Sequence, residues 1–221
     1  ANGRKILLSY PTASACALYA VKLSLNHIRE EGAGSLALRS VLAAMLVFVF
    51  FEVFPHVPVG VSEVHLILGS SLFLILGAAP TAIGLAAGLA LQSFFFEPQD
   101  LPQYGMNVTT LLAALFAMQA VARRVLPARL PYVELGYVHV LKMSAVFQGG
   151  IVAWVAFWTI YGRGFGAETL QAVGSFGAAY MTVVLLEPLV DLAVLAAAKE
   201  LRGRAGQGGS VLLARRLHHA A

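Results

Sequence analysis

Long apolar segments follow one another along almost the whole chain, and they constrain its fold more than any other feature of the sequence. A helix needs about 20 mainly apolar residues to cross the hydrocarbon core of a membrane. Segments near this length cover residues 10–27, 36–54, 64–78, 80–96, 105–122, 137–160 and 168–198. The sequence therefore predicts an all-α fold, a polytopic integral membrane bundle of about seven transmembrane helices (six to seven).

The composition leaves no room for a separate soluble domain. Hydrophobic residues make up 59% of the 221 residues and charged residues only 12%, against roughly 25% charged residues in soluble domains. We predict one transmembrane domain over residues 1–198, held by lipids in the cell inner (plasma) membrane. The glycine-rich stretch after Lys199 and the basic segment SVLLARRLHH predict a flexible, basic cytoplasmic tail over residues 199–221.

The basic residues predict the orientation of the bundle. With seven spans, ten of them fall on one side and three on the other. The first group is Arg29, Arg39, Arg123, Arg124, Arg129, Lys199, Arg202, Arg204, Arg215 and Arg216, and the second is Arg4, Lys5 and Arg163. By the positive-inside rule the N-terminus lies outside and the C-terminus in the cytoplasm. Because the net charge of +4 is explained by these helix ends and the tail, we expect no nucleic-acid partner.

Two outer connections then form a mouth that suits a cation. They carry His56, Glu63, His65, Glu97 and Asp100 and contain no Lys or Arg, so the predicted mouth is free of cations. A neutral imidazole is a good ligand for Co, Ni, Cu and Zn, which makes a histidine here a candidate metal ligand. The first candidate is His65, and a folded-back loop could bring His56 and Glu63 to the same ion.

Each of these residues has a structural alternative. A histidine at a membrane interface is often only solvated, and Glu63 can serve as a carboxylate at a helix N-terminus. The amides of Gln92 and Asn107 either orient metal ligands or form structural hydrogen bonds.

Two further patterns lie inside the spans. Gly84 and Gly88 form a GxxxG spacing that indicates close helix packing within the bundle or a docking face. Glu187 and Asp191 are four residues apart on one helix face, where we favour pairing with a cation such as Lys142 or Arg39 over a proton relay.

The central part of the chain resembles the CbiM/NikM family, the substrate-binding membrane subunits of cobalt and nickel energy-coupling-factor (ECF) transporters. The resemblance covers roughly residues 55–125 and rests on PVGVSEVHLILGSS, on the following Leu-Gly turn and on LPQYGMNVTT. The matching positions are Ser62, His65, Leu66, Gly77, Gln92, Gly105 and Asn107. The resemblance implies that residues 1–198 bind Co²⁺ or Ni²⁺ as the transported substrate, with Ser62, Gln92 and Asn107 orienting the ligands.

The start of the chain departs from the family pattern. The family begins Met-His, and its amino terminus and this histidine are implied as metal ligands. This sequence begins ANGRKILLSYP and has no histidine before His27. A small organic substrate therefore stays open as an alternative to a metal ion.

Catalytic and nucleotide-binding motifs are missing from the sequence. It contains no H-E-x-x-H, no G-x-S-x-G and no Walker P-loop, G-x-x-x-x-G-K-[ST]. We therefore predict no enzyme and no cofactor, with a membrane enzyme or redox protein as the remaining alternative class. Transport must depend on a separate transmembrane coupling protein and on ATPase subunits, and a small accessory membrane subunit is a further candidate partner.

Overall fold

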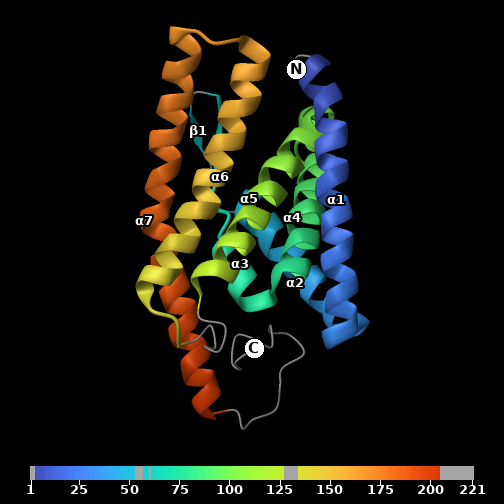
Figure 1. Cartoon of the computed structure of the whole chain (residues 1–221), viewed down its shortest axis with the longest axis vertical. Coiled ribbons are helices and arrows are strands. Elements are labelled where there is room, and N and C mark those ends of the chain that lie inside the picture. The colour runs from blue at the N-terminus through green and yellow to red at the C-terminus, as the bar shows by residue number, and fades with distance from the viewer. Residues whose placement is uncertain (1–2, 53–56, 60, 127–133, 205–221) are drawn as a thin grey trace.

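The structure is a computed structural model that describes residues 3–52, 57–59, 61–126 and 134–204. Long helices account for most of it (Figure 1). In chain order the elements are α1 (Gly3–Glu31), α2 (Ala33–Glu52), β1 (Val57–Val59), β2 (Ser62–Val64), α3 (Gly69–Leu76), α4 (Ala78–Phe95), η1 (Pro98–Gln103), α5 (Tyr104–Val125), α6 (Tyr137–Arg163) and α7 (Ala167–Arg204).

Six helical segments among the described residues are long and apolar enough to cross a membrane. They are α1, α2, α4, η1 with α5, α6, and α7 as far as Glu187. Their outer surfaces expose large apolar side chains such as Leu7, Leu18 and Leu185, each more than two-thirds exposed, as expected where lipid is the solvent. The predicted all-α membrane bundle is confirmed.

The third predicted span is wrong as a single helix. Residues 64–78 instead contain the end of β2, four residues without regular secondary structure, and α3, which is only eight residues long. The helix begins after Leu68, whose left-handed φ of 53° breaks the chain direction, and ends at Gly77 with a φ of 92°. This irregular backbone is tolerated because the surrounding helices bury the segment from Ile67 to Leu74.

Small residues bring α4 against α2. A Cβ atom added to Gly84 would collide with the side chain of Ala43, and one added to Gly88 would collide with Val47. Both partners are completely buried on α2. The GxxxG spacing therefore serves packing inside the bundle, since only glycine lets the two backbones come this close.

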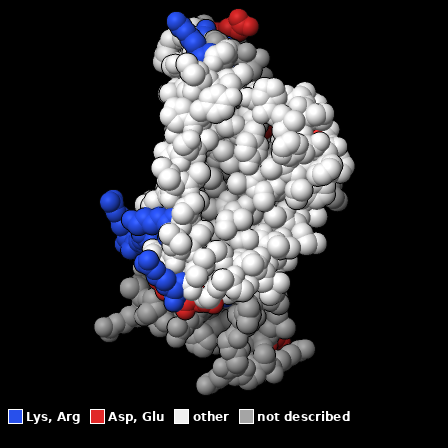
Figure 2. Space-filling view, turned by 90° about the vertical axis from the view of Figure 1, so that its right-hand side faces the viewer, with Lys and Arg blue, Asp and Glu red and all other residues white. Residues whose placement is uncertain are grey.

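The two ends of the described chain lie at opposite ends of the bundle (Figure 1). The first residues of α1 are at the top of the view, beside the α6–α7 connection, and the last turn of α7 is at the bottom. Figure 2 shows Lys and Arg side chains gathered low on the face that carries α1, with a smaller group at the top. Arg29 in the last turn of α1 and Arg123 and Arg124 in the last turn of α5 are all exposed.

This charge distribution predicts the orientation, with the end that holds Gly3 outside the cell. In a Cys16→Ala background, a membrane-impermeant thiol reagent added from outside should label Phe165→Cys, in the exposed α6–α7 connection. It should miss Gly34→Cys, at the exposed start of α2 on the opposite end. The reverse labelling pattern would place the N-terminal end in the cytoplasm.

The helix α7 extends past the predicted end of the transmembrane domain. It runs to Arg204, six residues beyond the predicted boundary at residue 198. Residues 205–221 of the predicted tail lie outside the described residues.

Candidate functional site

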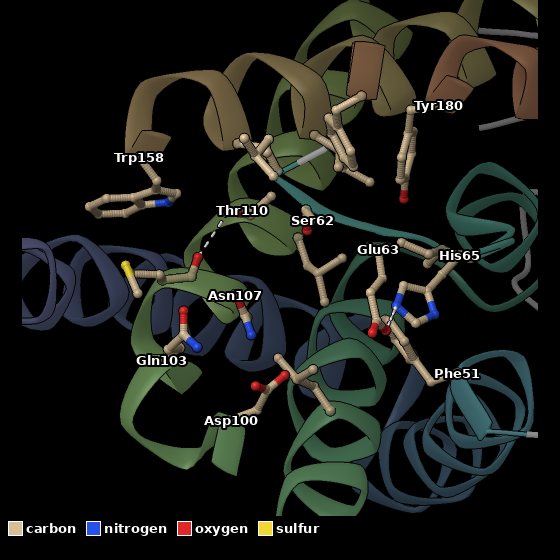
Figure 3. A pocket seen from close by; sticks show the side chains of 18 of the residues that line it. Phe51, Ser62, Glu63, His65, Asp100, Gln103, Asn107, Thr110, Trp158 and Tyr180 are labelled. Atoms are coloured by element: carbon tan, nitrogen blue, oxygen red, sulfur yellow. Dashed lines mark hydrogen bonds and ion pairs between the residues drawn. The ribbon is translucent and has the colours of Figure 1, made fainter. Parts of the chain in front are cut away.

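A polar pocket of about 300 Å³ lies among the helices. The β1–β2 hairpin contacts α7 and contributes one wall. Other walls come from η1 and the first turns of α5, from α6 and α7, and from the start of α1 (Figure 3). The first turns of α5 are held on α4 because the Tyr104 hydroxyl donates a 2.8 Å hydrogen bond to the backbone oxygen of Ala86.

Five of the six residues predicted at the site line this one pocket. They are Ser62, Glu63, His65, Gln92 and Asn107. They come from the hairpin, the segment after it, α4 and α5, so the fold brings together residues up to 45 positions apart in the chain. The sixth, His56, lies outside the described residues, as do residues 1 and 2. Their roles as ligands stay predictions.

The side chains of His65 and Glu63 face each other in the pocket (Figure 3). The distance from His65 Nε2 to Glu63 Oε2 is 3.3 Å. The imidazole is 13% exposed and the carboxylate 40% exposed, so the histidine lies deeper. One side of the imidazole contacts the Phe51 ring, with centroids 4.8 Å apart. This contact restricts the ring of His65 while its edge faces the carboxylate.

This spacing fits two neighbouring ligands of one metal ion. Nitrogen and oxygen ligands lie about 2.1 Å from a divalent ion such as zinc, so an adjacent pair is about 3.0 to 3.4 Å apart. An ion could therefore bind both atoms with little movement of either side chain. Across the described residues, no group of three His, Cys, Asp or Glu side chains is close enough to hold a metal. A full coordination sphere needs ligands beyond this pair.

The opposite wall carries neutral polar groups and aromatic rings together with the carboxylate of Asp100. In Figure 3 Gln103 and Asn107 project from the end of η1 and the start of α5, and the Tyr180 hydroxyl points inward from α7. Gln92 is 4% exposed, so its amide sits deep in the protein. Thr110 is already engaged, because its hydroxyl donates to the backbone oxygen of Met106 at 2.9 Å.

Among the described residues one cation, Lys5, lines the pocket, which corrects the prediction of a cation-free mouth. Lys5 lies on the lining, together with Glu97 and Asp100. The sequence analysis began the first span at residue 10, whereas α1 begins at Gly3 and carries Lys5 into the bundle against Gly162 of α6. The two connections themselves contain no Lys or Arg, as predicted. The described carboxylates on the lining still outnumber the one lysine.

Sequence reasoning also missed the pocket residues on α6 and α7. Trp158 and Tyr180 are at most 6% exposed and lie far along the chain from His65. Buried aromatic residues in an apolar helix are usually packing residues, so no pattern in the sequence separates these two from the core.

Together, these features define a multi-pass helical membrane protein with a polar pocket toward one end of the bundle. Residues 7–205 match the family CbiM, described as the cobalt uptake substrate-specific transmembrane region. The chain belongs to this family, which is a family of transporter components and implies a place in the plasma membrane. Comparison with curated proteins and with solved structures gave no match.

Proposed function

We propose that this chain is the substrate-capture subunit of an energy-coupling-factor transporter and binds Co²⁺ or Ni²⁺ in the pocket of His65. Family membership makes it a membrane component of cobalt uptake. The observation that carries the finer proposal is the His65–Glu63 pair, 3.3 Å apart at the position of the family motif. In this proposal His65 and Glu63 bind the ion, His56 adds a third ligand, and Ser62, Gln92 and Asn107 orient the set.

The subunit performs no covalent chemistry under this proposal. Because the sequence holds no Walker P-loop, ATP hydrolysis and coupling come from separate ATPase and transmembrane subunits, and a small accessory membrane subunit is a further candidate partner. Members of the family are typically parts of such multi-subunit transporters.

Metal titration tests the proposal. The purified chain, titrated with each ion in a calorimeter, should bind Co²⁺ or Ni²⁺ with one ion per chain and should not respond to Mg²⁺ or Ca²⁺. The reason is that an imidazole ligand favours the transition metals, whereas Mg²⁺ and Ca²⁺ take oxygen ligands. Absence of heat with both transition metals would reject the metal assignment.

A small organic substrate is the second candidate, favoured by the size of the cavity. At about 300 Å³ the pocket is larger than a single ion needs, and it lies at the lower end of the roughly 300–1,000 Å³ range of small-molecule sites. Mass spectrometry of the denatured, purified chain would then reveal a stoichiometric organic compound. Stoichiometric metal without such a compound would rule this candidate out.

A further inference from the structure

Glu187 is a fully buried acidic residue inside the bundle, and its partners are neutral. Its Oε2 accepts hydrogen bonds from the Ser144 hydroxyl at 2.7 Å and from Gln148 Nε2 at 2.6 Å, both on α6. The predicted pairing of Glu187 with Lys142 or Arg39 is therefore wrong, and Arg39 pairs with Glu31 at 2.7 Å. The side chain of Asp191 lies outside the described residues. Among the described residues this buried intramembrane carboxyl group has no cationic partner, and such a group calls for a specific role.

The same carboxyl group reaches a third element, the first turn of α3. The hydroxyl and the backbone N–H of Ser70 approach the Glu187 carboxyl group. Ser70 is completely buried and lies five residues after His65. Glu187 on α7 thus joins α6 to the segment that leads directly out of the pocket.

The segment between His65 and Ser70 is tightly fixed. Leu68 is the one non-glycine residue with a positive φ in the described part of the chain, and such a conformation persists only where the surrounding contacts hold it. The next residue, Gly69, lies so close to the Phe147 ring that a Cβ atom there would collide with it. The turn therefore packs against Phe147 of α6, and Ser70 at its end lies beside Glu187 of α7.

We propose that Glu187 is a positioning residue for the pocket: its hydrogen bonds to Ser144 and Gln148 and its contact with Ser70 hold residues 65–70 against α6 and α7, and so fix where the His65 ring lies. The expected effect of Glu187 on metal affinity rests on the proposed function. The position of residue 65 itself does not depend on whether a metal binds. The two consequences are therefore tested separately.

The first test measures Co²⁺ affinity by calorimetry in the full-length chain. Groups that orient a metal ligand typically change affinity about 10- to 100-fold when removed, and Glu187→Ala should weaken binding by this amount. Glu187→Gln keeps an acceptor oxygen for the donors on α6 and α3 and should stay within about threefold of the parent. Ser70→Ala, which removes only the hydroxyl donor on α3, should weaken binding less than Glu187→Ala.

Val183→Ala is the matched control. Val183 is buried on α7 one turn before Glu187, so its truncation also loosens the core. Its melting temperature should fall while its Co²⁺ affinity stays at the parent value. Equal loss of affinity in Val183→Ala and Glu187→Ala would mean general loosening and would overturn the proposal, as would parent-like affinity in Glu187→Ala.

The second test needs no metal. In a Cys16→Ala background, His65→Cys should react slowly with a water-soluble thiol reagent, because residue 65 is held in the pocket. Adding Glu187→Ala should speed this labelling, and adding Val183→Ala should not. An unchanged rate would overturn the positioning role. If the parent chain binds neither Co²⁺ nor Ni²⁺, the proposed function fails while the labelling rates still decide the role of Glu187.

Discussion

Replacing His65 by alanine should remove most of the affinity of the chain for Co²⁺ and Ni²⁺. Removal of a ligand should cost more than loss of an orienting group, so we expect a decrease of over about 100-fold in calorimetric titrations. The folded bundle should survive, because His65 lines the pocket, where the Phe51 ring lies beside its imidazole. We expect the free energy of unfolding to fall by about 1 kcal/mol, as for a typical substitution.

His139→Ala is the control for this prediction. His139 lies in the first turn of α6, at the end of the bundle opposite the pocket, and its side chain is only partly exposed. Its replacement should leave the affinity unchanged. If His65→Ala bound either ion as tightly as the parent chain, His65 would not be a ligand, and the family motif would indicate only the fold.

The chain alone should fail to accumulate metal in an ATP-dependent manner. In proteoliposomes that contain only this chain, uptake of radioactive Co²⁺ should stay at the level of empty vesicles with or without ATP, because no phosphate-binding loop is present in the sequence. Uptake should appear when the coupling protein and the ATPase subunits are co-reconstituted. ATP-dependent uptake is therefore expected with the complete complex and not with the chain alone.

Two controls test whether uptake depends on ATP hydrolysis and on His65. A complex with ATPase subunits whose P-loop lysine is replaced should not transport, and the complete complex carrying His65→Ala should hydrolyse ATP but lose uptake at low Co²⁺ concentration. ATP-dependent uptake by the isolated chain would contradict the role of a capture subunit.

The long helices were predictable because the membrane imposes a length and a composition on them. The predicted spans 36–54, 80–96 and 137–160 lie within a few residues of α2, α4 and α6. The segment 64–78 was not predictable by the same reasoning, because burial by protein demands apolar residues as strongly as lipid does. Only the φ of Leu68 and the burial around it reveal that the chain turns inside the bundle.

Part of the candidate site was also predictable. Glu63 and His65 are two positions apart in the sequence, and Gln92 and Asn107 are polar residues at or near the ends of apolar segments, so each could be recognised from the residues around it. No feature of the sequence placed Lys5 in the site, because a lysine before a predicted span indicates only the orientation of the helix in the membrane. The partners of Glu187 were missed because Ser144 and Gln148 are neutral, and charge pairing was the basis of that prediction.

The central claim is that a transition-metal ion binds at His65, and anomalous X-ray scattering tests it most directly. Crystals of the full-length chain grown with Co²⁺ would be measured on both sides of the cobalt absorption edge. We predict one anomalous peak in the pocket, about 2.1 Å from a ring nitrogen of His65 and at a similar distance from a Glu63 oxygen. A peak elsewhere in the protein, or a pocket without one at saturating Co²⁺, would contradict the assignment.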